Sequence, residues 1–261
     1  MTQRARVIRD NPSRNNPVHP GLSARPLSHS GLRAAGRKKW IDMATAALMG
    51  LTLLVIGDSH LATPKYLIGP LHDQLLERGA QVVTIGVCGA HAADWVKETT
   101  GDCGRAERRG SAPAQRQETD AKTTPVAQLI DRERPDAVIV VMGDTIGSYH
   151  NPEFPKSWAY SQVTTLTRAI ASAGVPCYWV GPGWGTEGGR FGKTYERVRV
   201  LNAFLAENVA PCTYIDSTRF SQPGEWKTLD GQHYLAAGYR AWGQAIAEAI
   251  AAQPPKKRGT P

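Results

Sequence analysis

Residues 51–60 read LTLLVIGDSH, an apolar run interrupted only by Thr52 that ends in a short polar turn. A run of this length without polar alternation is typical of a strand buried on both faces of a parallel sheet. Ser59 comes directly after this strand and before a predicted helix at 66–78. At such a turn its hydroxyl and its own backbone N–H can face the same space, so one residue supplies a nucleophile and an oxyanion donor. The alternative is an ordinary strand-to-helix turn with a capping Asp or Ser.

Strand-like and helix-like segments alternate along the rest of the chain. Apolar runs predict four further buried strands at 81–85, 137–142, 177–181 and 212–216. Helical patterns lie at 66–78, 124–134, 158–173, 194–208 and 235–252. Gly79 and Gly174 fall where helix C-caps are expected. The alternation predicts a three-layer α/β/α domain with a five-stranded parallel sheet, whose functional residues gather at the carboxyl ends of the strands.

Two stretches interrupt this alternation. Residues 99–123 are polar and charged without a period, and residues 182–193 are rich in glycine. Both are predicted to be loops.

The positive charge of the chain is concentrated at its two ends. The formal net charge is +8 over 261 residues, but residues 1–39 hold nine Lys or Arg and one Asp, and residues 256–258 hold three more basic residues. The remaining body therefore carries 19 basic and 22 acidic residues. A protein that binds nucleic acid through its phosphates needs positive charge on its folded surface, so this class is excluded. We expect one folded domain at 43–252, a disordered leader at 1–42 and a disordered basic tail at 253–261.

The leader admits two interpretations. Arg37, Lys38 and Lys39 precede a mostly apolar run at 43–56, which is the pattern of a secretion signal. Alternatively, the chain starts at Met43 or Met49 and the basic leader is a mis-assigned extension. The apolar run is too short for a stable membrane span. The signal-like leader and the even number of cysteines favour the periplasm or cell envelope over the cytoplasm.

Four cysteines form two candidate disulfides. Cys88 and Cys103 bracket a short polar segment, while Cys177 and Cys212 each open a predicted strand. Two bridges fit an oxidising compartment, and four reduced thiols are the alternative. None of the usual zinc-ligand spacings is present, so no metal is expected.

Three further polar segments follow predicted strands or precede the last helix. Asp230 and His233 are three residues apart, so one turn can aim both side chains at one point, with the carboxylate orienting the imidazole. Gly86 and Gly89 can let backbone N–H groups approach a ligand closely. Asp144 follows the third predicted strand. Each segment alone has a structural explanation as a cap or turn.

Taken together, these segments resemble the SGNH, or GDSL-type, hydrolase superfamily of esterases and lipases over residues 51–252. The first block is the GDSH segment at 57–60, the second is met by Gly89, and the last is the Asp-x-x-His pair followed by a closing helix. The resemblance implies a flavodoxin-like α/β fold and no cofactor. It also implies a catalytic triad of Ser59, His233 and Asp230, with Ser59 and Gly89 donating to the oxyanion.

The third block departs from the family pattern. Where the family has Gly-x-Asn-Asp, with the Asn donating to the oxyanion, this chain has Gly143, Asp144 and Thr145. An ionised carboxylate cannot donate a hydrogen bond and would repel the oxyanion. Three alternatives remain open: Asp144 is protonated, Thr145 takes its place, or the two backbone donors suffice.

Residues 188–194, GGRFGKT, are similar to a phosphate-binding P-loop but carry Glu187 where the motif needs glycine. No nucleotide is therefore expected, and we predict that this loop lies beside the acyl site. Trp184 in the same loop is a candidate substrate-binding platform for a sugar, or a packed aromatic.

The resemblance implies a serine esterase that hydrolyses small O-acyl esters, often acetyl groups on carbohydrate. Two alternatives use the same fold: an O-acyltransferase that passes the acyl group to a sugar hydroxyl, and a non-catalytic carbohydrate-binding or envelope-assembly protein. The expected partner in the enzyme hypotheses is a small acyl ester or an acylated carbohydrate.

Overall fold

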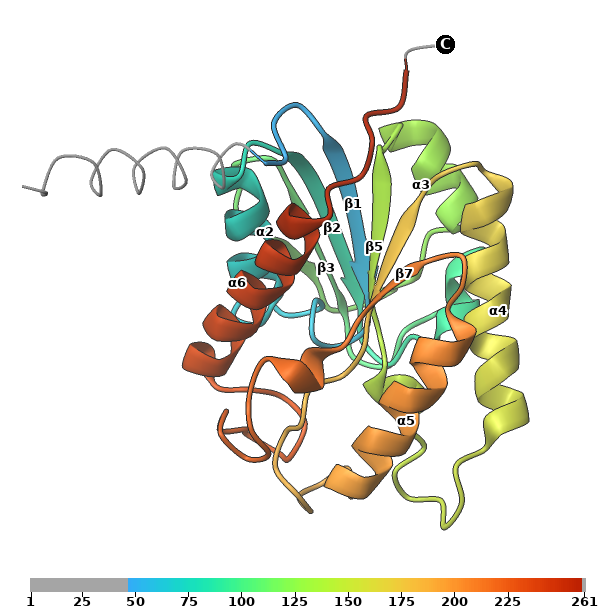
Figure 1. Ribbon diagram of the computed structural model, residues 1–261, viewed down its shortest axis with the longest axis vertical. Helices are drawn as coiled ribbons and strands as arrows, with labels where there is room; N and C mark the ends of the chain where they lie inside the picture. The colour runs from blue at the N-terminus through green and yellow to red at the C-terminus, as the bar shows by residue number, and fades with distance from the viewer. Residues whose placement is uncertain (1–46, 260–261) are drawn as a thin grey trace, which may run out of the picture. The chain divides into compact units, whose positions relative to one another are not determined.

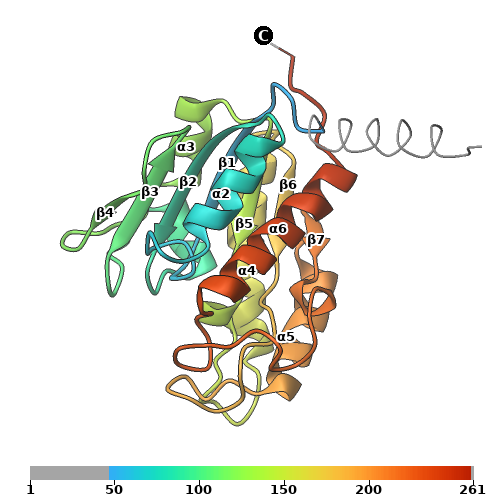
Figure 2. The same ribbon diagram turned by 90° about the vertical axis from the view of Figure 1, so that its left-hand side faces the viewer.

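The computed structural model describes residues 47–259. The predicted disordered leader at 1–42 lies outside the described residues. Within them, a seven-stranded sheet has the order β4-β3-β2-β1-β5-β6-β7 (Figures 1 and 2). The strands are β1 (Thr52–Gly57), β2 (Gln81–Val87), β3 (Arg105–Arg109), β4 (Gln115–Gln117), β5 (Ala137–Val141), β6 (Cys177–Val180) and β7 (Thr213–Ile215). The five predicted strands pair in parallel, which confirms the central sheet.

Helices cover both faces of the sheet and make it a three-layer α/β/α fold (Figure 1). On one face lie α2 (Ile68–Glu77) and α6 (Ala236–Ala252), and on the other lie α3 (Val126–Glu133), α4 (Lys156–Ser172) and α5 (Tyr195–Asn208). Alternate residues of β1 supply the two cores: Leu53 packs with α2 and α6, and Leu54 with α3, α4 and α5. Because both faces are buried, the strand needs an unbroken apolar sequence.

The stretch 99–123 is not the loop that the sequence predicted. It contains β3 and β4, an antiparallel pair that extends the sheet beyond β2 (Figure 2). Only Ala106 of these two strands is fully buried; the others are partly or fully exposed. An edge hairpin needs no apolar face when ion pairs such as Arg109 with Glu133 support it, and its sequence therefore lacks the alternation that marks a strand.

Both candidate disulfides are present. Cys88 is bonded to Cys103 and joins the end of β2 to the segment before β3, and Cys177 is bonded to Cys212 beside the parallel pair β6 and β7. No helix within residues 47–259 combines the length and hydrophobicity that a bilayer crossing needs.

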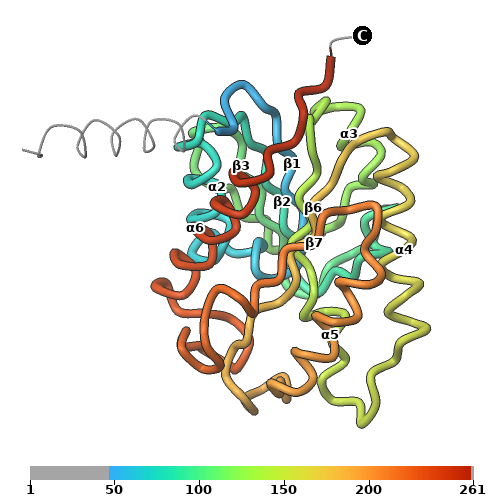
Figure 3. Tube along the Cα trace, viewed as in Figure 1, coloured from blue at the N-terminus to red at the C-terminus, as the bar shows by residue number. Residues whose placement is uncertain are grey.

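A close backbone approach sets the position of the turn after β1. Gly57 at the end of β1 lies opposite Gly86 on β2. A Cβ on Gly86 would lie 2.2 Å from the backbone carbonyl carbon of Leu61, so only glycine lets this turn pack against β2. The long connections after β5, β6 and β7 gather at the same end of the sheet (Figure 3).

His72 on α2 is fully buried and neutral. Its Nε2 donates to the carbonyl oxygen of Gly110, and its Nδ1 accepts from the Thr84 hydroxyl, both at 2.8 Å. Burial lowers the pKa of His72 to about 4, because the charged imidazolium is poorly solvated there.

Acid should therefore weaken the fold through His72. Below pH 6.5 the unfolded chain binds a proton at this side chain that the folded chain does not, so the free energy of unfolding falls between pH 6.5 and about 4. We expect His72 to account for about 3 kcal/mol of this loss. Urea unfolding of the wild type and of His72→Gln at several pH values measures it. The His72→Gln variant should have a lower free energy of unfolding than the wild type at pH 7, but should lose less of it on acidification. Equal losses for the two proteins would contradict the role given to His72.

Candidate active site

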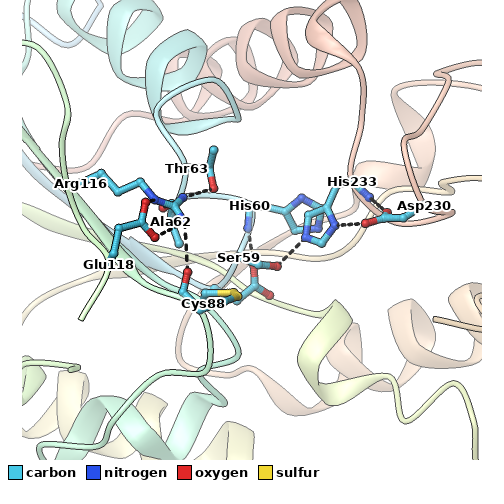
Figure 4. The surroundings of a disulfide bond; sticks show 11 residues. Ser59, His60, Ala62, Thr63, Cys88, Arg116, Glu118, Asp230 and His233 are labelled. Carbon is cyan, nitrogen blue, oxygen red and sulfur yellow. Dashed lines mark hydrogen bonds and ion pairs between the residues drawn. A yellow bond between two sulfur atoms is a disulfide. The ribbon is translucent and has the colours of Figure 1, made fainter. Parts of the chain in front are cut away.

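Ser59 lies in the turn between β1 and α2, where the sequence predicted it. The turn is held by hydrogen bonds from Leu61 N–H to the Asp58 carbonyl oxygen at 3.0 Å and from Ala62 N–H to that of Ser59 at 3.2 Å. Ser59 Oγ lies 2.8 Å from His233 Nε2, although 174 residues separate them (Figure 4). The structure therefore brings the candidate nucleophile and the candidate base into direct contact.

Asp230 orients His233 through three hydrogen bonds. Its Oδ2 lies 2.8 Å from His233 Nδ1, and its Oδ1 accepts from the backbone N–H groups of Gln232 at 3.0 Å and of His233 at 2.8 Å (Figure 4). These local bonds fold residues 230–233 into one turn before α6. With Nδ1 donating to Asp230, His233 Nε2 is free to accept the proton of Ser59.

The surroundings favour a charged Asp230 and a neutral His233. Burial acts to raise the pKa of Asp230, but the hydrogen bonds from His233 and Gln232 outweigh it and lower that pKa below its ordinary value. Burial and the neighbouring His60 lower the pKa of His233, against the opposing effect of Asp230. His233 can therefore act as a base in solutions more acidic than pH 6.5.

Two backbone N–H groups at the site have no hydrogen-bond acceptor among the described residues. They belong to Ser59 and Gly89, which both line a cavity of about 470 Å³. Gly89 has a φ of +78°, and a Cβ there would collide with the side chain of Asp102, so the position requires glycine. Two unpaired donors beside a serine hydroxyl are what an oxyanion hole requires.

Asp144 begins η2 (Asp144–Ile146), directly after β5, and its carboxylate accepts from three sides. Oδ1 accepts from Lys193 Nζ at 2.7 Å and from the Tyr149 hydroxyl, and Oδ2 lies 2.8 Å from His60 Nε2. Burial acts to raise the pKa of Asp144, but Lys193 and His60 outweigh it and hold that pKa well below its usual range.

This geometry argues against the alternative in which a protonated Asp144 donates to the oxyanion. An ionised carboxylate that is already bonded to three donors can only accept. The neighbouring Thr145 lines the same cavity, and its buried hydroxyl has no partner among the described residues. Thr145 thus remains the third donor candidate.

Sequence reasoning missed His60 and Lys193. His60 links Asp144 to the Tyr239 hydroxyl at 2.9 Å, and its ring centroid lies 5.1 Å from that of His233. The Lys193 side chain is only 1% exposed. The available signal was the acidic residue at position 144, because a buried carboxylate requires a cationic partner.

Arg116 is a third residue that the sequence did not single out. From β4 it donates to the Ala62 carbonyl oxygen at 3.1 Å, to Thr63 Oγ1 at 2.7 Å and to the Cys103 carbonyl oxygen at 3.2 Å (Figure 4). The edge hairpin thereby ties the turn that carries Ser59 to the segment that carries the disulfide.

Trp184 is not among the residues that line the cavity at Ser59. Its Nε1 donates to the carbonyl oxygens of Thr218 and Ser221 at 3.0 Å, which favours the packed aromatic over the sugar platform. The loop does reach the site through Arg190 and Phe191, which line the cavity. The Phe191 ring packs edge-on against that of His233 at 5.6 Å.

The sheet order and the two helical layers are the architecture that the sequence resemblance to the SGNH, or GDSL-type, hydrolases implies. Two solved structures with a TM-score of 0.50 share it, each 13% identical and covering 77% of this chain and 97% of its own. They are an acetyl esterase mutant with an acetate ion and a carbohydrate esterase family 3 protein from Talaromyces cellulolyticus. No family model matches the sequence.

Protein BcsX of Komagataeibacter xylinus is 42% identical to this chain over 218 residues, which cover 83% of this chain and 82% of that protein. The chain therefore belongs to the BcsX family.

Removal of the Lys193 charge should destabilise the fold. Lys193→Met leaves the Asp144 carboxylate buried without its ammonium partner, which costs about 3–5 kcal/mol. The double variant Asp144→Asn/Lys193→Met removes both charges and should recover much of that loss. Unfolding free energies measured in urea test this.

Lys122→Met is the matched control. It removes a lysine whose ion pair with Glu98 is exposed, and should leave the free energy of unfolding almost unchanged. Equal losses for the two single variants would show that the buried pair contributes no more than a surface pair.

Proposed function

We propose that this protein is a serine esterase that hydrolyses O-acyl esters through an acyl-enzyme. The observation that carries the proposal is the continuous hydrogen-bonded series Ser59, His233 and Asp230, with 2.8 Å at each side-chain contact. An ordinary turn or cap explains each residue alone, but no structural need explains why all three converge, with Ser59 and His233 lining a cavity. This convergence matches the requirements of acyl transfer through serine.

The reaction follows from the positions of these groups. His233 Nε2 takes the proton as Ser59 Oγ attacks the ester carbonyl carbon, and Asp230 stabilises the imidazolium. Collapse of the tetrahedral intermediate breaks the bond to the alcohol, which leaves with the proton from His233. Water then attacks the acyl-serine with His233 again as base, which releases the acid and restores Ser59.

The developing oxyanion needs donors that the resting protein leaves free. The N–H groups of Ser59 and Gly89 and the hydroxyl of Thr145 are such donors beside the cavity. Lys193 offsets the negative charge of Asp144, so that this carboxylate repels the oxyanion less than an unpaired one would.

The proposed substrates are small acyl groups, with acetyl as the first choice, on a carbohydrate. The cavity of about 470 Å³ beside Ser59 is lined in part by Phe191 and by the disulfide of Cys88 with Cys103. The two proteins of similar fold are an acetyl esterase and a carbohydrate esterase by name, which agrees with this choice. Transfer of the acyl group to a sugar hydroxyl would use the same residues and differs in the acceptor.

Ser59→Ala should abolish catalysis without unfolding the protein. We expect the rate of p-nitrophenyl acetate hydrolysis to fall by at least about 10³-fold, because the acyl-enzyme cannot form. A fluorophosphonate should label the wild type at Ser59, as mapped by mass spectrometry. Ser111→Ala, in the exposed segment between β3 and β4, is the control and should keep full activity. Equal rates for wild type and Ser59→Ala would leave the non-catalytic binding hypothesis.

The pH dependence of kcat/KM should report His233. Its pKa is lowered by burial and by His60, so the base remains neutral below pH 6.5. The acid limb of the profile should therefore have its midpoint below 6.5, with activity lost as His233 becomes protonated. Rates with p-nitrophenyl acetate from pH 4 to 8 measure this. A midpoint above 6.5 would contradict the proposed state of the base.

A further inference from the structure

A second cavity, of about 900 Å³, lies next to the one at Ser59 and has no part in the mechanism above. Two contacts connect the walls of the two cavities. Tyr149 lines the second cavity and bonds through its hydroxyl to Asp144, which lines the first. His91 lines the first cavity and packs edge-on, at 5.3 Å, against Trp158, which lines the second.

The second cavity is built on a fixed loop. It lies where the segment after η2 meets the first turns of α4 and α5 (Figure 1). The guanidinium of Arg197 on α5 donates to the backbone carbonyl oxygens of four residues in that segment: Gly147, Ser148, Asn151 and Pro152. These bonds hold the loop in place without a ligand, as expected for a preformed binding site.

The lining suits a neutral, hydroxyl-rich ligand. Trp158 is 37% exposed, so part of its flat indole surface is available for packing. The charges of the lining balance, because it holds two acidic residues, Glu153 and Glu196, and two basic ones, Lys156 and the already engaged Arg197. An anionic polymer would require an excess of positive charge, and a lipid acyl chain would require an apolar lining.

We propose that this cavity is a binding subsite for a neutral oligosaccharide that extends from Trp158 past His91 to Ser59. The esterase would then act on acyl groups carried by a neutral glycan chain. The catalytic part of this inference rests on the proposed function, but the binding part does not. Tyr149 would couple the two sites, because it contacts both the subsite and the Asp144 network.

Binding without catalysis is tested by isothermal titration calorimetry with xylohexaose, a neutral probe. We expect Trp158→Ala to weaken binding about tenfold, which corresponds to the loss of roughly 50 Å² of apolar contact. The matched control is Tyr160→Ala on the same helix, since Tyr160 is 47% exposed but does not line the cavity. Equal effects of the two variants, absence of xylohexaose binding at millimolar concentration, or tighter binding of an oligogalacturonate of equal length would overturn the proposal.

Kinetics separate the subsite from the esterase activity. With acetylated xylohexaose, Trp158→Ala should raise KM about tenfold, while kcat/KM for p-nitrophenyl acetate, which does not occupy the subsite, should change much less. Loss of activity on both substrates would contradict a subsite role. If the wild type binds xylohexaose through Trp158 but cleaves neither ester, the proposed function fails and the subsite stands.

Discussion

The arrangement of the site depends on the buried carboxylate of Asp144. Its three partners come from different segments: His60 from the turn after β1, Lys193 from the loop after β6, and Tyr149 from the loop after η2. The Asp144 carboxylate thus holds together three connecting segments that are distant in sequence. Because a buried charge without partners is costly, each of these segments must stay close to Asp144 in the folded protein.

The same network reaches His233, the proposed base. Burial and the neighbouring His60 lower the pKa of His233. Asp230 and Asp144 act in the opposite direction but do not outweigh them. His60 in turn is held between Asp144 and the Tyr239 hydroxyl. The carboxylate at position 144 therefore has a structural and electrostatic role of its own, and in the proposed reaction the oxyanion donors come from elsewhere.

The fold of this protein and its proposed reaction rest on different observations. The solved structures of similar fold are only 13% identical to it, so they establish the α/β/α architecture alone. The BcsX relationship is closer and covers most of both chains. The chemical proposal rests on the contacts of Ser59, His233 and Asp230. The loops around these residues, and Trp158 beyond them, give this chain a surface that the shared fold does not specify.

The sequence by itself determined the parallel strands, the helices and the turn that carries Ser59, because each follows from local periodicity and short-range chemistry. The Asp230 turn is also local, since its bonds span three residues. Only the tertiary structure decided the polar edge hairpin, the partners of Asp144 and the packing of Trp184. Their physical basis is a set of contacts between distant segments, and a buried Lys193 looks no different in sequence from an exposed one.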